Sequence, residues 1–306
     1  MKTPLNNSSI LVVGATGMLG TEICKQLREA NKKVKGLIRA SSDPRRVEML
    51  HELGVETVIA DIKDEASLSK AMKGVEAVIS TVSSTHSRQE GDTIETVDHL
   101  GQINVINAAA KARVRQFVYI SVIEMDDEFP LQTAKREVEQ HLMHSTLNYT
   151  ILRPAMFMDV WLSPSLGFDH PEAKATIFGD GVNKISWIAV KDVATFAVKS
   201  LENFAGLNKI IDLGGPEALS PLEVVKIFEK EKGTTFSVEQ IPVAVLEAQK
   251  HASSDPLQQS FACLKLAYAR GCVVDMNVPV EKLPFKMTSV SDYARHIHHH
   301  ITTAVL

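Results

Sequence analysis

The stretch Ser9-Ile10-Leu11-Val12-Val13-Gly14-Ala15-Thr16-Gly17-Met18-Leu19-Gly20 decides the fold. It is an apolar run rich in β-branched residues, and it leads directly into three glycines spaced Gly-x-x-Gly-x-x-Gly. The following residues, 21–30, have a helical pattern. A strand, a glycine turn and a helix N-terminus in this order form the pyrophosphate site of dinucleotide-binding proteins. We therefore predict such a site at the start of the chain. The alternative is a tight turn between strand and helix that holds no ligand.

The residues of the turn have separate expected roles. Gly14 lets the chain turn tightly, Gly17 lacks the Cβ that would block the pyrophosphate, and Gly20 lets the helix pack close to the strand. The helix N-terminus offers free N–H groups and a positive dipole to the phosphates. The cofactor-binding residues expected here are Gly14, Thr16, Gly17, Met18, Leu19 and Gly20.

The next predicted strand, residues 33–40, indicates which dinucleotide binds. Its end lies about 20 residues beyond the glycines, where an NAD-binding chain carries Asp or Glu for the ribose hydroxyls. Arg39 occupies this position. An arginine would hold the 2′-phosphate of NADP(H) with charge-assisted hydrogen bonds, whereas an acid would repel it. We predict NADP(H) as the cofactor; the alternative is that Arg39 is a solvated surface residue. Arg45 and Arg46 are expected on an exposed helix face.

Strands and helices alternate through the first half of the chain. Strands are predicted at 55–60, 77–81, 116–121 and 149–153, and helices at 67–73, 96–112 and 134–144. Repeated units of this length predict an α/β fold of the Rossmann-like type, a doubly wound parallel sheet with helices on both faces. Ligands of such sheets lie beyond the carboxyl ends of the strands. Further cofactor-binding residues expected at that edge are Asp61, Ile62, Thr81, Ser83 and Ser121.

Beyond residue 155 the pattern becomes less regular. We expect a dinucleotide-binding domain at 1–154 and a smaller, mainly helical lobe at 155–306 that covers the cleft and is partly interleaved with the first domain. Residues 157–175 are expected to be irregular. Phe157, Met158 and Trp161 could form an apolar wall for a substrate, although such a group is more often plain core.

Composition is typical of a soluble enzyme. The chain has 306 residues, of which 44% are hydrophobic and 23% charged, with a net charge of −4. This mild acidity does not indicate nucleic-acid binding, for which a basic charge balance is typical. No apolar run reaches the roughly 18 residues of a membrane span, and residues 1–7 lack the apolar core of a signal peptide. The three cysteines lack metal spacing, and a functional metal site is not expected in the histidine-rich segment 296–300. We therefore expect a cytoplasmic location.

Several segments together resemble the NmrA-like family of atypical short-chain dehydrogenase/reductases. They are the glycine turn 14–20, the strand end at Arg39, 61–62, 118–121, Lys135, 152–154, 185–188 and Asp192. The resemblance covers about residues 8 to 295. It implies a Rossmann fold that binds NADP(H). Members include NADPH-dependent reductases of quinones and phenylpropanoids, catalytically silent sensors of the NADP(H) redox state, and proteins that assist assembly of photosynthetic complexes.

The resemblance raises one question about catalysis. Standard short-chain dehydrogenases carry Tyr-x-x-x-Lys, in which the tyrosine donates a proton and the lysine lowers its pKa while bonding the nicotinamide ribose. Here Lys135 is present, but Leu131 occupies the tyrosine position. Lys135 can hold the ribose, or, if desolvated, act as acid or base itself. It could also be a surface lysine that pairs with Glu139.

Two functions from different classes follow. The first is an NADPH-dependent oxidoreductase that passes hydride to a small quinone-like, carbonyl or enone acceptor, with Lys135 as the catalytic residue. The second is a non-enzymatic NADP(H) sensor or assembly scaffold that binds a partner protein. The loss of the tyrosine favours the second, whereas the retained lysine and the apolar lobe favour the first.

Overall fold

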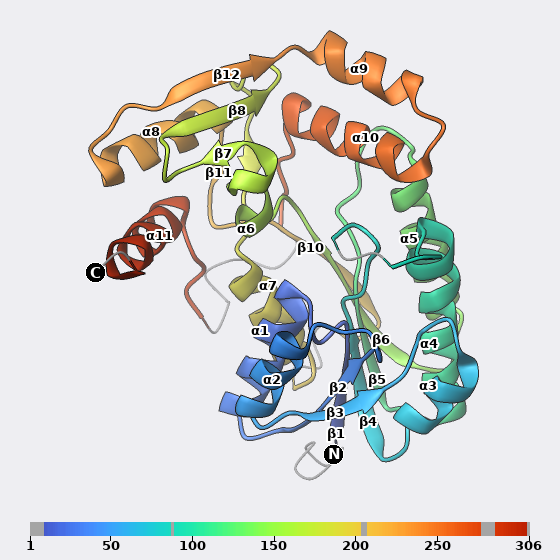
Figure 1. Ribbon diagram of the computed structural model, residues 1–306. Coiled ribbons are helices and arrows are strands. Elements are labelled where there is room, and N and C mark those ends of the chain that lie inside the picture. Colours follow the sequence, from blue (N-terminus) through green and yellow to red (C-terminus); the bar gives the residue numbers. More distant parts are fainter. Residues whose placement is uncertain (1–8, 87–88, 203–206, 277–284, 305–306) are drawn as a thin grey trace. The chain divides into compact units, whose positions relative to one another are not determined.

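The run Ser9–Val13 forms strand β1 of a seven-stranded sheet, shown in Figure 1. The strand order is β10-β6-β5-β4-β1-β2-β3, and β1 pairs in parallel with both β2 and β4. The pairs β2–β3, β4–β5 and β5–β6 are also parallel. The Rossmann-like doubly wound sheet predicted from the sequence is thereby confirmed.

A computed structural model describes residues 9–86, 89–202, 207–276 and 285–304. The chain divides into two compact units, and each is described by itself below. The first unit comprises Met1–Val122, Pro130–Arg153 and Val193–Ile211, and the second comprises Ile123–Phe129, Pro154–Asp192 and Asp212–Leu306. Three segments of the chain thus build each unit.

The first unit contains the sheet and the helices that flank it. Its strands are β1, β2 (Lys33–Ile38), β3 (Glu56–Ile59), β4 (Val75–Ser80), β5 (Gln116–Ile120), β6 (Asn148–Pro154) and β10 (Lys209–Leu213), of which β6 and β10 end in the second unit. Its helices are α1 (Met18–Glu29), α2 (Pro44–Glu52), α3 (Glu65–Ala71), α4 (Leu100–Lys111), α5 (Pro130–Met143) and most of α7 (Val190–Ser200). A π-helix, η1 (Ile94–His99), precedes α4.

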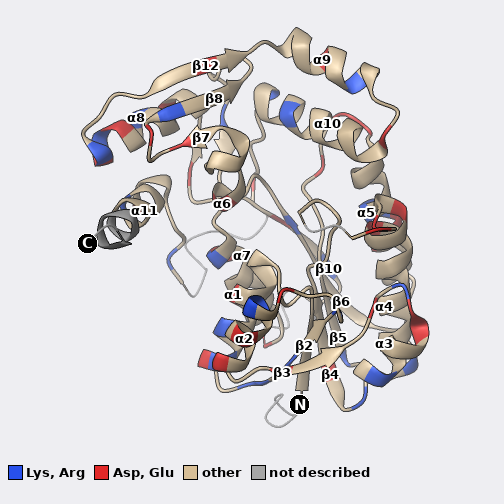
Figure 2. Ribbon diagram, viewed as in Figure 1, with Lys and Arg blue, Asp and Glu red and all other residues tan. Residues whose placement is uncertain are grey.

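Both faces of the sheet are buried. Leu11 and Val13 of β1 pack in one core cluster with residues of α3, α4 and α5. Ile10 and Val12 point to the opposite face, because side chains alternate along a strand, and they are also fully buried. In Figure 1, α1, α2 and α7 lie on one side of the sheet and α3, α4 and α5 on the other. Strands β1 and β5 contain no charged residue (Figure 2), as expected for strands covered on both faces.

Local signals explain where the helices begin. Asp43 accepts a hydrogen bond from the Arg45 N–H, and Pro44 follows as the first helical residue of α2. Asp64 caps α3 in the same way. Thr93 and Thr96 form a reciprocal capping box at the start of η1. The sequence predicted a helix from residue 96, whereas the helical segment begins at Ile94 and its first part is a π-helix.

The second unit combines helices with two small sheets. Its helices are α6 (Met158–Trp161), α8 (Pro221–Lys232), α9 (Val243–Ala252), α10 (Pro256–Arg270) and α11 (Val290–Ala304). Strands β12 (Ser237–Ile241), β8 (Lys174–Phe178) and β7 (Phe168–Asp169) form one sheet, and β11 (Ala218–Leu219) pairs with β9 (Ile185–Ser186). The mainly helical character expected for this half is present, although it also contains these two sheets. The segment 157–175, expected to be irregular, contains α6, β7 and the start of β8.

Candidate functional site

The glycine turn is built by close backbone approach. Gly14 has a φ of +88°, a conformation that side chains disfavour, and a Cβ there would lie 2.6 Å from Oγ1 of Thr81. A Cβ on Gly20 would lie 2.0 Å from the carbonyl oxygen of Gly14. Gly20 therefore allows α1 to start directly against the end of β1, as the sequence predicted.

Gly17 has a different environment from its two neighbours. It is the N-cap of α1, has no side-chain cap, and is exposed. A Cβ there would meet only the carbonyl oxygen of Gly14, at 3.2 Å. The turn itself therefore does not exclude a small side chain at this position. An open helix N-terminus beside a side-chain-free residue is the arrangement that binds a pyrophosphate.

We expect a difference in stability between alanine substitutions at Gly20 and Gly17. Gly20→Ala should lower the free energy of unfolding by about 3 kcal/mol, because its Cβ collides with fixed backbone. Gly17→Ala should cost less than about 1 kcal/mol, since its φ of −77° is ordinary for alanine. Urea denaturation of both variants checks this. An equal loss of unfolding free energy in the two variants would contradict the close contact of Gly20 in α1 with Gly14 at the end of β1.

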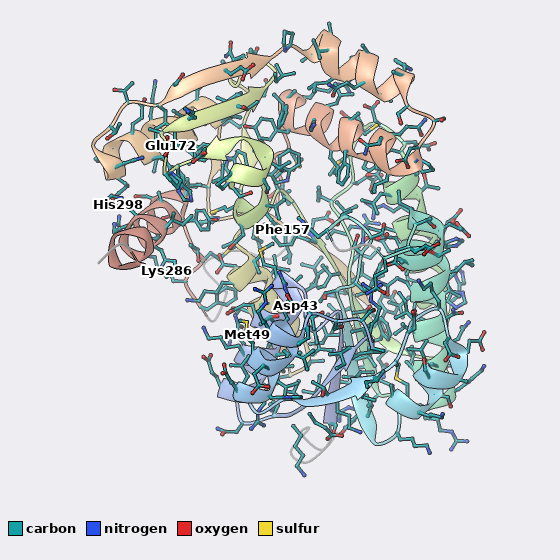
Figure 3. All side chains as sticks on the ribbon, viewed as in Figure 1. Asp43, Met49, Phe157, Glu172, Lys286 and His298 are labelled. Carbon is teal, nitrogen blue, oxygen red and sulfur yellow. The ribbon has the colours of Figure 1, made fainter. Side chains whose placement is uncertain are left out.

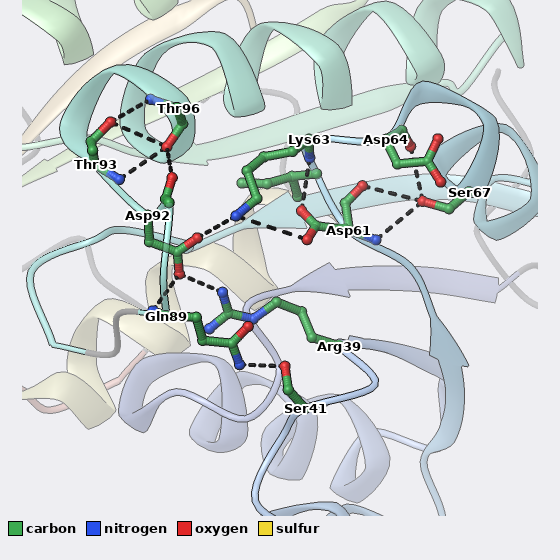
Figure 4. Close-up of polar contacts among 12 residues, drawn as sticks. Arg39, Ser41, Asp61, Lys63, Asp64, Ser67, Gln89, Asp92, Thr93 and Thr96 are labelled. Carbon is green, nitrogen blue, oxygen red and sulfur yellow. Dashed lines mark hydrogen bonds and ion pairs between the residues drawn. The ribbon is translucent and has the colours of Figure 1, made fainter.

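Arg39, which directly follows β2, is part of an ion-pair cluster. Its Nη1 lies 2.5 Å from Oδ2 of Asp92, and Nζ of Lys63 lies 2.5 Å from Oδ1 of the same carboxylate (Figure 4). Arg39 and Lys63 follow the adjacent strands β2 and β3, so their side chains meet at one edge of the sheet. The structure thus does not place Arg39 as a solvated surface residue. It brings a second cation, Lys63, to the position expected to bind a 2′-phosphate.

Two further arginines were expected on an exposed helix face. Arg45 fits this expectation, since its side chain is 90% exposed and pairs with Asp43. Arg46 is also exposed, but its Nη1 donates a hydrogen bond to the carbonyl oxygen of Thr16, at 2.7 Å. It therefore contacts the glycine turn, which periodicity alone did not indicate.

The other expected cofactor-binding residues lie where β3, β4 and β5 end. Asp61 accepts a hydrogen bond from the Lys63 N–H, and Ile62 is buried in the core. Thr81 donates to the carbonyl oxygen of Val13, at 3.2 Å. The Ser83 hydroxyl lies 3.2 Å from that of Thr85. Their binding roles stay predictions.

Lys135 is buried in α5, with 6% of its surface exposed, so it is not a surface lysine. Its Nζ lies 3.9 Å from Oδ1 of Asp98 and 5.5 Å from the centre of the Tyr119 ring. Among the described residues, this Nζ donates no hydrogen bond. Burial lowers the pKa of Lys135, while the charges of Asp98 and Glu139 oppose this only in part. A desolvated lysine of this kind can hold or exchange a proton.

The π-helix places Asp98 beside Lys135. Asp98 is fully buried, and its Oδ2 accepts hydrogen bonds from the N–H and the hydroxyl of Ser84. Its Oδ1 has no hydrogen-bond partner among the described residues, and neither has the buried hydroxyl of Tyr119. Both a π-helix and unsatisfied buried polar atoms are frequent at functional sites.

Glu139 forms a second buried network on the same helix. It accepts hydrogen bonds from Arg136 at 2.6 Å, from Arg153 and from the hydroxyl of Ser121. No ion pair joins Lys135 to Glu139, so the pairing considered from the sequence is absent between these two described residues. Ser121, expected to contact the cofactor, donates to this carboxylate, which two arginines hold in place, and its binding role stays a prediction.

Sequence reasoning missed Lys63, Asp92, Asp98 and Glu139 as members of these clusters. Lys63 follows the Asp61-Ile62 pair directly, and its position at a strand end was an available signal. The sequence does not indicate the path of the loop after β4. Asp92 lies in this loop, and Asp98 lies in the π-helix that follows it. Their partners are more than ten residues away in the chain, so only the tertiary fold reveals them.

The three expected substrate residues lie in the second unit. Phe157, labelled in Figure 3, immediately precedes α6 and is partly exposed. Met158 is fully buried in the aromatic core of this unit. Trp161 stacks on Tyr268 at a centroid distance of 5.2 Å. Their role toward a substrate stays a prediction.

Cysteines and histidines add no metal centre in the described part of the chain. No group of three or more His, Cys, Asp or Glu side chains there could hold a metal ion. Burial raises the pKa of Cys24 to about 12, so this thiol is unreactive. The side chains of His299 and His300, in the histidine-rich segment, lie outside the described residues. Within the described ranges, none of the helices has the length and apolar character needed to span a membrane.

A family model and several known proteins each match most of the chain. A model of the NmrA-like family matches residues 6–294. The photosystem II assembly factor Ycf39 of Synechocystis sp. is 31% identical over 244 residues, which are 78% of this chain and 72% of that protein. The NAD(P)H azoreductase of Xenophilus azovorans is 27% identical over 255 residues, or 83% of each chain.

A solved structure shares the fold over nearly the whole length. The NADPH-dependent quinone oxidoreductase QOR2 of Escherichia coli, complexed with NADPH, has a TM-score of 0.76 at 24% identity. The match covers 94% of this chain and 99% of that one.

Proposed function

Because the chain belongs to the NmrA-like family, we propose that it is an NADPH-dependent oxidoreductase. The acceptor we propose is a small quinone-like, carbonyl or enone compound. The observation that carries the proposal is the environment of Lys135 in α5. This lysine is buried, and it has no hydrogen bond among the described residues. The names of two similar proteins, a quinone oxidoreductase that binds NADPH and an NAD(P)H azoreductase, support the same class of reaction.

The residues of the first unit fit NADP(H). The turn around Gly17 leaves the N-terminus of α1 open for the pyrophosphate, and Arg39 and Lys63 supply two cations for the 2′-phosphate. Lys135 is the residue that would hold the nicotinamide ribose, and the Asp98 carboxylate beside it favours the charged ammonium form. When bound, the reduced nicotinamide supplies the hydride.

Lys135 has two roles in this proposal. It binds the ribose through its ammonium group, and it delivers a proton to the atom of the acceptor that gains negative charge. Burial lowers the pKa of Lys135, which makes the loss of its proton easier than for an exposed lysine. Asp98, at 3.9 Å, stabilises the charged form and orients the side chain. The lysine thus donates the proton that a tyrosine donates in standard short-chain dehydrogenases, because Leu131, at the tyrosine position, has no proton to give.

A second function is favoured by a specific observation. Leu131 is buried and stands where standard short-chain dehydrogenases carry the proton-donating tyrosine. The relative with 31% identity is a photosystem II assembly factor. The alternative proposal is therefore a non-enzymatic NADP(H) sensor or assembly scaffold that binds a partner protein rather than a small-molecule substrate.

A turnover screen separates the two functions. Purified protein is incubated with NADPH and a panel of quinones, aldehydes and enones, and the absorbance of NADPH is followed. The reductase predicts oxidation of NADPH with at least one acceptor class, and this activity is absent without acceptor. NADPH binding without turnover across the panel would favour the sensor or scaffold.

We expect NADPH to bind more tightly than NADH by about tenfold to a hundredfold, because charge-assisted hydrogen bonds hold the 2′-phosphate. Arg39→Asp should abolish or reverse this preference. Arg45→Leu is the matched control, since it removes a cation that is 90% exposed and paired with Asp43. Calorimetry with both dinucleotides measures the effect. Equal affinities in the parent protein would contradict the assignment of Arg39.

A further inference from the structure

Asp92 is an unexpected member of the cluster predicted to bind a phosphate. Its carboxylate is 1% exposed and holds Arg39 through one oxygen and Lys63 through the other. The N–H of Gln89 donates a third hydrogen bond to Oδ2, at 2.9 Å. Burial raises the pKa of Asp92, but the hydrogen bonds from Lys63 and Arg39 lower it by more, so the group is an anion at neutral pH.

The backbone around Asp92 is also fixed. The Asp92 N–H donates to the carbonyl oxygen of Gln89, at 2.9 Å, and the hydroxyl of Thr96 donates to that of Gly91, at 2.8 Å. The side chain of Gln89 hydrogen-bonds the hydroxyl of Ser41, beyond the end of β2 (Figure 4). Two side chains thus join residues 89–93 to the ends of β2 and β3. They are the carboxylate of Asp92 and the side-chain amide of Gln89.

The charges of the cluster balance. Arg39 and Lys63 contribute two positive charges, while Asp92 and Asp61, whose Oδ2 lies 4.0 Å from Nζ of Lys63, contribute two negative charges. A phosphate monoester adds a charge of about −1.5 to −2 at neutral pH. Binding it beside an intact Asp92 contact would leave an excess of negative charge on two shared cations. A phosphate that takes the place of the carboxylate restores the balance.

We propose that Asp92 is a specificity-determining residue of the dinucleotide site, an internal anion that competes with the 2′-phosphate for Arg39 and Lys63. This inference rests on the proposed NADP(H) site. A dinucleotide with a 2′-phosphate must displace the carboxylate and release residues 89–93 from the strand ends. A dinucleotide with a free 2′-hydroxyl leaves the Asp92 contacts in place. Asp92 therefore limits the preference for NADP(H) that the two cations create.

The test compares the affinities of NADP⁺ and NAD⁺ for the parent protein and Asp92→Asn by calorimetry at fixed salt. The substitution removes the competing charge and keeps the shape of the side chain. We expect NADP⁺ to bind about tenfold more tightly and NAD⁺ to change by less than about twofold. Glu90→Gln is the matched control, because it removes the same charge two residues away, and it should change neither affinity by more than about twofold.

Two results would overturn the inference. Weaker NADP⁺ binding by Asp92→Asn would mean that the carboxylate orients the cations for the phosphate, and unchanged affinities would mean that it does not compete. Hydrogen exchange of the parent protein gives a second reading that needs no variant. NADP⁺ should increase exchange at the amides of Gln89 and Asp92, and NAD⁺ should not; equal exchange with both would also contradict the proposal.

These measurements distinguish the inference from the proposed function. If neither dinucleotide binds the parent protein, the NADP(H) site and the inference both fail. If both dinucleotides bind the parent protein and Asp92→Asn does not change the affinity for NADP⁺ relative to that for NAD⁺, only the role of Asp92 is rejected. Turnover does not enter either measurement, so a protein that binds NADP(H) without catalysis can still confirm the competition.

Discussion

Lys135→Ala is expected to lower the turnover of an accepted substrate by about 10²–10⁴-fold, which is the usual contribution of proton transfer by a positioned side chain. Its effect on the dissociation constant of NADPH should be much smaller. Lys135→Arg should be similarly slow, because an arginine keeps the charge but does not give up its proton. Steady-state kinetics and calorimetry on the same preparations measure the two quantities separately.

The structure adds two requirements to this experiment. Removal of Lys135 leaves the buried carboxylate of Asp98 without its ion-pair partner, so the variant must be shown to be folded. Lys111→Ala is a suitable control, because that lysine is an exposed residue of α4 that pairs only loosely, at 3.6 Å, with Glu65. Weakened NADPH binding at unchanged turnover, with partial rescue by Lys135→Arg, would show that the lysine only holds the ribose.

The pH dependence of turnover gives an independent reading of the same residue. Since burial lowers the pKa of Lys135, the pH–rate profile of the parent protein should contain a titration below the ordinary lysine value of about 10.4. If the protonated lysine is the acid, turnover falls as the pH rises through this pKa. This limb should be missing in both Lys135 variants. A parent profile without it would argue against Lys135 as the acid.

Gly17→Val has the second large expected effect, a loss of dinucleotide affinity of more than about a hundredfold. The added side chain stands at the open N-terminus of α1, where the pyrophosphate is expected to bind. The fold should remain largely intact, because the nearest atom to a Cβ at this position is the carbonyl oxygen of Gly14, at 3.2 Å. Calorimetry with NADPH and circular dichroism measure the two outcomes.

Gly17→Ala provides the graded control for this substitution. Its smaller side chain should give an intermediate loss of affinity with little change in stability. A folded Gly17→Val protein that binds NADPH with the parent affinity would place the dinucleotide elsewhere. The contrast with Gly20→Ala, which is expected to disturb folding, separates a glycine required for a ligand from one required for packing.

Much of the fold follows from short segments of sequence. The β-branched run Ser9–Val13 and the three glycines require a strand, a tight turn and a helix in close contact, and the structure shows this arrangement. The alternation of the following strands and helices predicts a parallel sheet, because a helix that crosses over between two strands joins them in parallel with one preferred handedness. Arg39 could be located in the same way, since its distance from the glycines is set by one βαβ unit.

The small sheet of the second unit was not predictable in this way. Strand β7 has two residues, and β8 and β12 are separated by about 60 residues that include α7 and α8. Strands this short carry little periodic signal, and β12 is mostly exposed, so it lacks the apolar alternation that marks a strand. The pairing of β8 with β12 depends on how the intervening elements fold.

The sequence by itself determined the sheet, the glycine turn and the chemical type of the candidate residues, because each of these depends on neighbours within about 20 positions. Only the tertiary structure decided which charges meet. Arg39 and Lys63 follow two different strands, and Asp92 comes from the loop before the π-helix. Lys135 has its ion-pair partner Asp98 in that π-helix. Electrostatic partnership depends on distance in space and on burial, and a linear pattern encodes neither of these for residues that lie far apart in the chain.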